Sequence, residues 1–413
     1  MELTRLLLWL AAAGLVTSTG FLGLVIFASL RFRNRTSIAS AAVNVCPPVT
    51  LLKPLCGMEP NLETNLASFF AQQYPSFEIV FGTRDESDPA LDVVRAIRKN
   101  FPHVPIKVVT TGEPRQANAK VCSLMKMYAA ASHDYLIISD SDVHVTPDYV
   151  REVVRPLLQP EVGLVTCLYR GVPTGGFWSR MEALGMSVEM TSGVLVADLL
   201  EGMKFALGPT MATRRDVLER VGGLGILADY CSDDYVLGAA VYGAGRNVLL
   251  SEHIIEHVVI NRSFRSSLQH QVRWMKSTRF SRAWGHVGSV LTFSMPFGLL
   301  GLAAAMWTHR PVLGGIFVLV ACLNRILLAL TSGWVVVGDR RSLRFCWLYP
   351  LRDLMGIGFW GASFFGRTIL WRGDRYRLEH GGRMILCTNA ASAHLESRER
   401  ETLSSAIPVD HLS

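Results

Sequence analysis

The sequence of 413 residues has few charged residues, no paired cysteine motif and no phosphate-binding loop of the ATPase type. Charged residues make up 18% of the chain, against about 25% in ordinary soluble domains, while apolar residues reach 50%. This balance excludes a disordered chain and argues against a fully soluble one. The motif GxxxxGKS or GxxxxGKT does not occur, which excludes a P-loop ATPase.

Cysteine pairs and charge blocks are also missing. The eight cysteines form no CxxC pair and no regular spacing, so neither a zinc site nor a disulfide framework is indicated, and we expect reduced thiols. The net charge of +7 includes no block of five or six like charges. We therefore expect no nucleic-acid partner, and attraction to a membrane surface fits the modest basic excess better.

Long apolar stretches are what the sequence has instead. Leu6–Leu30 carries no charged residue over 25 positions, whereas a signal-peptide core has only about 7 to 15, so we expect an uncleaved membrane anchor over residues 1–30. The anchor is followed by Arg31, Arg33 and Arg35, and the positive-inside rule then places the next residues in the cytoplasm.

Two further stretches, His286–Trp307 and Val312–Val337, predict a transmembrane helical hairpin over residues 286–337 whose ends return to the cytoplasm. Within it, Asn324 and Arg325 lie near mid-depth, where a cation costs about 2.5 kcal/mol or more. We therefore expect both side chains to face protein, water or a lipid headgroup. A helix–helix hydrogen bond is an equally good explanation.

Phe345–Trp371 is also apolar, but Arg352 and Asp353 interrupt it and arginines crowd its far end. A full span would place those arginines outside. We therefore predict re-entrant or interfacial helices over residues 338–380 rather than a fourth span. Residues 381–413 are polar and unpatterned, which predicts a flexible tail.

Between the anchor and the hairpin, apolar runs of strand length alternate with helical patterns. This rhythm predicts an α/β domain with a largely parallel sheet. The expected strands are Val49–Leu52, Phe77–Gly82, Ile106–Val109, Tyr135–Ser139 and Val162–Thr166. The expected helices cover residues 61–73, 89–99, 117–131 and 147–158. Ligands of such sheets lie beyond the carboxyl ends of the strands, so polar residues directly after each run are the candidate site residues.

Asp140 and Asp142 directly follow the strand pattern of Tyr135–Ser139. Two carboxylates one residue apart at a strand end are able to share a hard divalent cation, Mg²⁺ or Mn²⁺, which neutralises a nucleotide diphosphate. A solvated strand-to-helix turn is the structural alternative.

Asp85 and Lys120 are candidate nucleotide-binding residues. Asp85 follows a second predicted strand and is available to a base or ribose, whereas the neighbouring Asp88 and Pro89 match a helix cap and first turn. Lys120 begins a predicted helix, where its ammonium and the helix dipole favour an anion such as a diphosphate. A solvated helical lysine explains Lys120 equally well.

Asp233 and Asp234 precede the apolar helix pattern of Val236–Tyr242. Adjacent aspartates point in different directions on a helix, so one is able to cap while the other reaches a cleft. A carboxylate held near an acceptor hydroxyl acts as a general base when partial burial keeps its pKa close to the working pH. Pure N-capping is the alternative.

His270, Arg273 and Trp274 lie directly before the hairpin, in a stretch rich in Arg, Lys, Trp and Phe that predicts an interfacial helix over residues 266–285. We expect Arg273 to reach a diphosphate, with Trp274 at the mouth for an acceptor. A snorkelling arginine and an aromatic-belt tryptophan are the alternatives.

Taken together, these motifs resemble the ceramide glucosyltransferase-type family, glycosyltransferase family 21, whose GT-A domain carries a D, D, D, (Q/R)xxRW pattern. The bacterial hopanoid-biosynthesis branch is similar as well. The resemblance covers about Leu51 to Met384, and its ordered motifs are Asp85 to Pro89, Asp140-Ser-Asp142, Asp233-Asp234 and Arg273-Trp274. It implies a Rossmann-like GT-A nucleotide-sugar-binding domain over residues 31–265.

The resemblance further implies an inverting, metal-dependent transfer of a hexose from UDP-glucose or UDP-N-acetylglucosamine to a hydroxyl of a membrane lipid. The acceptor would be a ceramide-type lipid or a hopanoid polyol, at the cytoplasmic face of a bacterial inner membrane. By this resemblance Asp85 binds the uridine side, Asp140 and Asp142 bind the ribose and the Mg²⁺ or Mn²⁺, and Asp234, beside Asp233, is the base.

The same resemblance gives Arg273 and Trp274 the task of holding the diphosphate and closing the site, with Lys120 and His270 also binding the nucleotide sugar. Two positions depart from the family pattern. His270 occupies the Gln or Arg position of the last motif, where an imidazole is still able to donate a hydrogen bond. Asp142 completes a full Asp-Ser-Asp, whereas the animal ceramide enzymes resemble it only in the first carboxylate, which favours the bacterial branch.

Three other functions stay open as alternatives. A processive polysaccharide synthase shares the fold and several motifs, but it needs a membrane tunnel, for which two or three spans are too few. A polyprenyl-phosphate glycosyltransferase would transfer onto phosphate rather than hydroxyl. A membrane transporter would place paired polar groups inside many spans, whereas nearly all candidate chemistry here lies in the soluble domain.

Overall fold

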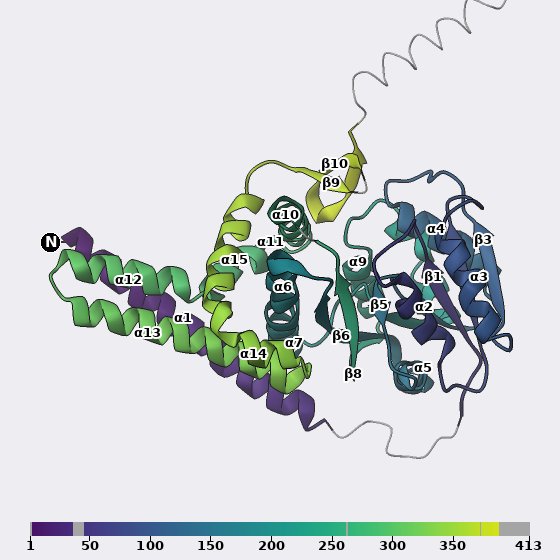
Figure 1. Cartoon of the computed structure of the whole chain (residues 1–413), viewed down its shortest axis with the longest axis horizontal. Coiled ribbons are helices and arrows are strands. Elements are labelled where there is room, and N and C mark those ends of the chain that lie inside the picture. The colour runs from purple at the N-terminus through teal and green to yellow at the C-terminus, as the bar shows by residue number, and fades with distance from the viewer. Residues whose placement is uncertain (1, 36–44, 262, 372, 388–413) are drawn as a thin grey trace, which may run out of the picture.

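The structure, a computed structural model, consists of an α/β domain and a projecting group of long helices (Figure 1). The helices α1 (Glu2–Arg33), α12 (Met295–Trp307) and α13 (Pro311–Leu328) run side by side away from the α/β domain. The residues that the structure describes are 2–35, 45–261, 263–371 and 373–387.

Eight strands form the central sheet of the α/β domain: β1 (Val49–Pro54), β2 (Phe77–Thr83), β3 (Ile106–Thr110), β4 (Tyr135–Ile138), β5 (Val143–His144), β6 (Val162–Pro173), β7 (Met211–Arg214) and β8 (Asn247–Val259). Their order across the sheet is β3-β2-β1-β4-β7-β6-β8-β5. The first four in this order are mutually parallel. β7 is antiparallel to both neighbours, β8 is parallel to β6, and β5 is antiparallel to β8.

The predicted α/β class is confirmed, and each predicted strand is present. The sheet is mixed, however, because β7 enters it in the opposite direction between β4 and β6. β8 was not predicted, since Glu252, His253, Glu256 and His257 interrupt its apolar pattern. Its pairing with β6 continues to Val259, and this pairing also extends β6 well beyond the predicted end.

Helices cover both faces of the parallel half of the sheet. They include α2 (Leu62–Phe70), α3 (Ala90–Asn100) and α4 (Ala119–Ala130), which correspond to three predicted helices, and α5 (Tyr149–Val154) matches the fourth. Leu51 and Leu52 on β1 point to opposite faces and are both fully buried, as expected for a strand covered on two sides. Because β2, β1 and β4 are parallel, their carboxyl ends lie at one edge of the sheet. The start of α4 lies at the same edge.

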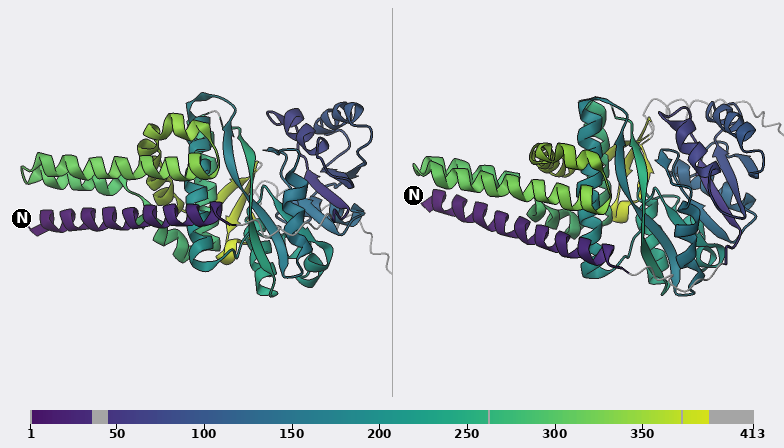
Figure 2. Two further views of the ribbon diagram at one scale, coloured as in Figure 1. Left: turned by 90° about the horizontal axis from the view of Figure 1, so that it is seen from below. Right: turned by 60° about the horizontal axis from the view of Figure 1, so that its bottom comes forward.

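A long apolar helix, Gly176–Glu201, lies across the base of the projecting helices in both views of Figure 2. It consists of α6 (Gly176–Gly185), a π-helical segment and α7 (Thr191–Glu201). Sequence analysis did not predict it, because polar residues such as Glu182 and Glu189 interrupt its apolar pattern. Both carboxylates take part in contacts inside the protein, which explains how an apolar helix tolerates them.

Within the described residues, three helices are long and apolar enough to cross a membrane: α1, Gly176–Glu201 and Pro311–Val336. The last is α13 with the π-helical segment that follows it. The predicted anchor and the second predicted hairpin helix are among them. The first hairpin helix, predicted as one span over His286–Trp307, is broken. Ala283–Thr292, which includes α11 (Ala283–Gly288), meets α12 at a bend of 50°.

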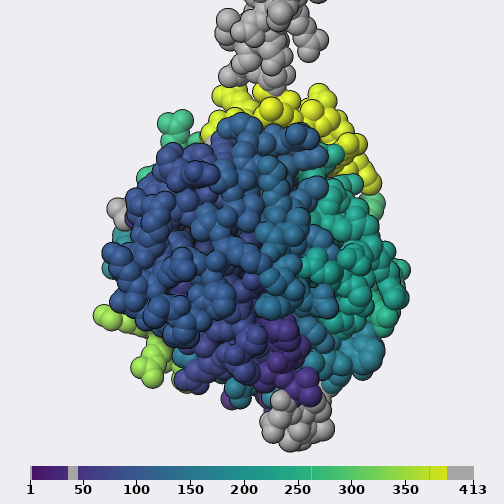
Figure 3. Space-filling view, turned by 90° about the vertical axis from the view of Figure 1, so that its right-hand side faces the viewer, coloured from purple at the N-terminus to yellow at the C-terminus, as the bar shows by residue number. Residues whose placement is uncertain are grey.

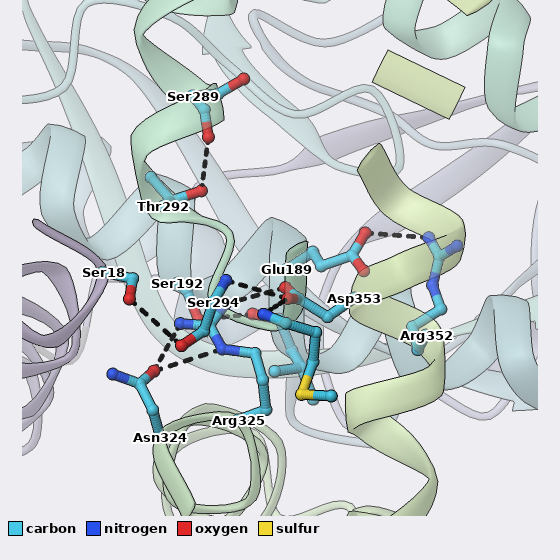
Figure 4. Close-up of polar contacts among 12 residues, drawn as sticks. Ser18, Glu189, Ser192, Ser289, Thr292, Ser294, Asn324, Arg325, Arg352 and Asp353 are labelled. Atoms are coloured by element: carbon cyan, nitrogen blue, oxygen red, sulfur yellow. Dashed lines mark hydrogen bonds and ion pairs between the residues drawn. The ribbon is translucent and has the colours of Figure 1, made fainter. Parts of the chain in front are cut away.

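Asp353 explains the break before α12. One of its carboxylate oxygens accepts hydrogen bonds from the backbone N–H groups of Ser294 and Met295, at 2.9 and 2.8 Å (Figure 4). These are donors that a continuous helix would use internally, so the carboxylate caps a new helix start in the middle of the apolar stretch.

The other oxygen of Asp353 pairs with Arg325 on α13 at 3.0 Å, and both side chains are buried (Figure 4). The Arg325 guanidinium also donates to the side-chain oxygen of Asn324, whose amide donates to Thr19 on α1 at 3.1 Å. Asn324 and Arg325 therefore face protein, which is one of the predicted surroundings, and their contacts run between helices. They join α1, α12 and α13 to the helix Tyr349–Ser363, which carries Asp353.

The C-terminal part contains α14 (Arg340–Phe345), α15 (Tyr349–Ser363) and an antiparallel sheet of β9 (Thr368–Trp371), β10 (Asp374–Leu378) and β11 (Met384–Leu386). α15 has 15 residues, fewer than the roughly 20 that a span needs. The tail predicted from residue 381 was wrong at its start, because β11 pairs with β10. Residues 388–413 of that tail lie outside the described residues.

Candidate active site

Two of the three predicted acidic motifs, those of Asp140 and Asp233, converge on Lys120. The side chain of Asn118 caps α4 by accepting from the backbone N–H of Val121, which places Lys120 in the first helical turn. Lys120 Nζ lies 2.7 Å from Asp140 Oδ1 and 3.4 Å from Asp233 Oδ2. Burial alone would lower the pKa of Lys120, but the attraction of Asp140 and Asp233 raises it above its usual value. Lys120 is therefore a fixed cation between two distant motifs.

A second lysine, Lys53 on β1, lies beneath Asp140. Its side chain is fully buried, contacts the backbone carbonyl oxygen of Asp140 and lies 3.6 Å from the centre of the Phe69 ring. Burial lowers the pKa of Lys53 to about 7, although Asp140 acts in the opposite direction. Lys53 was not among the predicted site residues. The sequence signal that could have identified it is the presence of a lysine inside an otherwise apolar strand.

Asp234 lies at the start of α9 (Asp233–Gly243), and its carboxylate is held by backbone donors. Oδ2 accepts from the N–H of Gly208 at 2.8 Å, and Oδ1 accepts from the N–H of Tyr235 at 2.7 Å. Burial, followed by repulsion from Asp233, raises the pKa of Asp234 to about 6. The side chain is thus oriented and remains a stronger base than an exposed aspartate.

Gly208 is the point at which Asp234 and Asp140 meet. A Cβ atom at this position would lie 3.3 Å from Asp234 Oδ2 and 3.8 Å from Asp140 Oδ2. Burial would raise the pKa of Asp140, but Lys120 more than offsets this and lowers it. The two carboxylates therefore differ: Asp140 is held as an anion by Lys120, while Asp234 is the more basic group.

Asp142 has a partner that the sequence did not suggest, His257 on β8. The Asp142 Oδ2 to His257 Nε2 distance is 3.6 Å, because Val143 of β5 pairs with His257 in the sheet. Within the described part of the chain, Asp142 Oδ1 and His257 Nδ1 are buried without a hydrogen-bond partner. A carboxylate oxygen and an imidazole nitrogen in this state suit a divalent cation. Across the same residues, however, no cluster of three or more His, Cys, Asp or Glu side chains forms a complete metal site.

Asp85 and Asp88 have different surroundings after β2. Asp85 is exposed, and its Oδ1 accepts from the N–H and the hydroxyl of Ser87, at 2.9 and 2.5 Å. Asp88 accepts from the N–H of Ala90 at 2.9 Å and from the N–H of Gly57. Asp88 therefore fastens two loops together, as its predicted cap role suggests, whereas the contacts of Asp85 are local.

The interfacial helix is present as α10 (Phe264–Ser281), which ends before Arg282 rather than at residue 285. The guanidinium carbon of Arg273 lies 5.6 Å from the centre of the Trp371 ring on β9, and Trp274 packs against the core of the α/β domain. His270 Nδ1 lies 2.6 Å from Glu182 Oε1 on α6. The three residues of the last motif therefore contact three different parts of the fold.

Comparison with known proteins identifies the family to which the chain belongs. The family model described as glycosyl transferase family 21 matches residues 11–384. The chain belongs to glycosyl transferase family 21. It is similar to ceramide glucosyltransferase 1 of Caenorhabditis elegans, with 25% identity over 354 residues, covering 83% of this chain and 74% of that protein. Ceramide glucosyltransferase 3 of the same organism is 23% identical over 347 residues, covering 82% and 74%.

The fold of this family 21 glycosyltransferase has a counterpart among solved structures. A mannosyltransferase from Pyrobaculum calidifontis, solved in complex with GDP-mannose and Mn²⁺, superposes with a TM-score of 0.53 at 17% sequence identity. The match covers 87% of this chain and 99% of that one. The likeness confirms the GT-A-like α/β fold that the motifs predicted.

In the family 21 chain, the loop before Asp233 is held from several sides. The side-chain amide of Asn118 donates to the carbonyl oxygen of Tyr230 at 2.8 Å, and the N–H of Cys231 donates to the carbonyl oxygen of Gly382 at 3.0 Å. Figure 3 shows the C-terminal strands in yellow along the rim of the α/β domain, beside its blue N-terminal half. Sequence analysis placed Gly382 at the start of a tail and so missed this support.

Proposed function

We propose that this glycosyltransferase moves a hexose from a UDP-sugar to a hydroxyl of a membrane lipid, with inversion, at the cytoplasmic face. The convergence of Asp140 and Asp234 on Gly208, with Lys120 between Asp140 and Asp233, carries the proposal. One oriented base beside one fixed cation is what a single displacement requires. The ceramide glucosyltransferases among the relatives support a lipid acceptor.

Asp234 acts as the general base in this proposal. With a pKa of about 6, its carboxylate is mostly deprotonated at neutral pH and is still basic enough to take a proton in the transition state. The backbone N–H groups of Gly208 and Tyr235 fix its direction. The acceptor oxygen attacks the anomeric carbon, its proton passes to Asp234, and the bond from that carbon to the UDP oxygen breaks.

Lys120 and Arg273 stabilise the negative charge that develops on the departing UDP. A Mg²⁺ or Mn²⁺ ion, held by Asp142 with Asp140 and His257 beside it, would add to this neutralisation when bound. The unpartnered Asp142 Oδ1 and His257 Nδ1 support this assignment, as does the Mn²⁺ in the related mannosyltransferase.

The other predicted site residues have the following roles in this proposal. Asp85 binds the uridine side, while Arg273 and Trp274 close the site near the acceptor. Residues 1–30 and 286–337 anchor the enzyme. Arginines at the end of α1 and within α14 support a cytoplasmic location for the domain over residues 31–265. The segment 338–380, which contains α15, then lies at the membrane interface.

The test is identification of the product. Full-length protein in lipid nanodiscs is incubated with Mg²⁺ or Mn²⁺, labelled UDP-glucose or UDP-N-acetylglucosamine, and either a ceramide or a hopanoid polyol. We expect one donor and acceptor pair to give a glycosylated lipid whose mass equals acceptor plus hexose, with an anomeric configuration opposite to that of the donor. Label on a polyprenyl phosphate or in a polymer, or a retained configuration, would contradict the proposal.

A further inference from the structure

Glu182 and His270 form a buried couple that the proposed reaction does not use. Glu182 is 1% exposed, and both of its carboxylate oxygens have polar contacts inside the protein. Oε1 accepts from the side-chain amide of Asn261 at 2.9 Å and lies 2.6 Å from His270 Nδ1, while Oε2 accepts from the hydroxyl of Ser267 at 2.7 Å. An ionised carboxylate only accepts hydrogen bonds, so His270 presents an N–H at Nδ1.

This pairing leaves the other ring nitrogen of His270 available. With a proton on Nδ1, Nε2 accepts a hydrogen bond whenever the ring is neutral. The side chain of His270 is 25% exposed, and no residue that the structure describes forms a hydrogen bond with Nε2. The ring also packs on Trp274, with 4.6 Å between ring centres, so its direction is fixed from two sides.

The couple lies toward one end of the α10 face that borders the acidic site. His270, Arg273, Trp274 and Ser277 follow a spacing of three and four residues, which places them on one helix face. At one end, Ser277 contacts Ser232, next to Asp233. At the other end, His270 contacts α6, part of the helix that lies across the base of the projecting helices (Figure 2).

An exposed aromatic cluster adjoins the couple at the first turns of α6 and α10. Phe177 and Phe264 are 45% and 47% exposed, and Trp178 contacts both rings, with centres 5.1 and 4.7 Å away. Aromatic side chains of this kind are typical of the membrane–water interface. A lipid at this position would have an apolar surface for its chain and an acceptor nitrogen for its headgroup.

We propose that His270 binds the lipid acceptor, taking a hydrogen bond at Nε2 from a hydroxyl or amide N–H of the headgroup other than the reacting hydroxyl. Glu182 is the positioning residue that holds the ring in the required tautomer and direction. The inference rests on the proposed transfer to a membrane lipid and names a contact that selects its acceptor.

The experiment compares E182Q, H270A and the double variant E182Q/H270A with the wild type, using the full-length enzyme in nanodiscs. Initial rates are measured against acceptor and against UDP-sugar concentration. We expect E182Q to raise the KM for the lipid acceptor about tenfold, as for the loss of one hydrogen bond, and to leave the KM for UDP-sugar within about twofold. H270A should show the same split, and the double variant should lose no more than H270A.

Ser263→Ala is the matched control. Ser263 caps α10 without touching the couple, so its loss loosens the helix start but should leave the acceptor KM unchanged. UDP affinity, measured by titration, reports folding of every variant.

Three outcomes would overturn the inference: a raised donor KM in E182Q, an additive loss in the double variant, or an equal acceptor effect in Ser263→Ala. If the wild type transfers sugar but E182Q keeps its acceptor KM, the inference alone fails. If the wild type glycosylates no lipid, the proposed function itself fails.

Discussion

Charges are buried in two regions of this protein, and they are satisfied differently. In the helical part, both oxygens of Asp353 are engaged, one by Arg325 and the other by two backbone N–H groups. In the α/β domain, among the residues that the structure describes, Asp142 Oδ1 and His257 Nδ1 have no hydrogen-bond partner, and Asp233 Oδ2 has only its ion pair with Lys120.

Among the described residues of the helical part, Glu189 Oε1 and Arg352 Nε are also buried without a hydrogen-bond partner, so the contrast is between the Arg325–Asp353 pair and the groups around Lys120. A buried polar group without a partner costs free energy, so it persists where a ligand completes it. The fully paired Arg325 and Asp353 hold a broken helix in place and need nothing further. The incompletely paired groups around Lys120 are where we expect a nucleotide and a metal to bind. The following predictions test this contrast.

The largest effect is expected from Asp234→Asn. The amide still accepts from the N–H of Gly208 but is too weak a base, so we expect the transfer rate to fall about 10²- to 10⁴-fold with UDP affinity unchanged. Rates and UDP titrations check this. Asp216→Asn, an exposed carboxylate on α8 (Arg215–Arg220), is the control and should keep wild-type activity. A preserved rate in Asp234→Asn would exclude this residue as the base.

In the helical part, Asp353→Ala should act on stability. It leaves Arg325 buried without its counter-charge, which costs about 3–5 kcal/mol in the free energy of unfolding. Denaturant or thermal unfolding in detergent measures the change. The double variant R325M/D353L removes both charges and should recover part of the loss. No isolated charge then remains, but the N–H groups of Ser294 and Met295 still lack their acceptor. Equal instability of single and double variants would mean that the pair is not what stabilises the break.

Asp142→Ala should weaken the metal dependence of nucleotide binding. We expect the divalent-cation concentration required for half-maximal UDP binding to rise about 10- to 100-fold, with a similar effect for His257→Ala. Calorimetric titration of UDP at several Mn²⁺ concentrations measures this without turnover. If the metal titration of Asp142→Ala matched that of the wild type, Asp142 would not be a metal ligand.

The smallest effect is expected from pH. Burial and Asp233 raise the pKa of Asp234 to about 6, and the base works deprotonated, so kcat/KM should rise about tenfold between pH 5 and pH 7. Asp233→Asn removes the neighbouring negative charge and should move this acidic limb to lower pH. A limb that did not move in Asp233→Asn would belong to another group.

The parallel half of the fold was predictable because its residues obey short-range rules. Apolar runs marked β1 to β4, and the polar residue after each run marked Asp140 and, beyond β2, Asp85. Lys120 followed from its place in the first turn of α4. The candidate residues on this edge were predictable from sequence because the ends of parallel strands share one edge whatever lies further along the chain; their roles stay predictions.

The other half depended on contacts that no local pattern contains. Gly176–Glu201 carries two carboxylates, Glu182 and Glu189, whose partners come from α10 and α15, and these charges interrupt its otherwise apolar sequence. His257 reaches Asp142 only through pairing between β5 and β8. The break before α12 is set by Asp353, which lies 58 residues away from Met295 in sequence.

Backbone pairing between Cys231 and Gly382 has a consequence for how the enzyme is made. The strand after Gly382 leaves the ribosome only once α12 and α13 have been synthesised and are free to enter the bilayer. The segment that carries Asp233 and Asp234 thus receives its last support after membrane insertion, and nascent chains that stop at residue 380 should bind UDP poorly. In this proposal, a chain that has not yet entered the membrane would therefore use little sugar donor in the absence of its lipid acceptor.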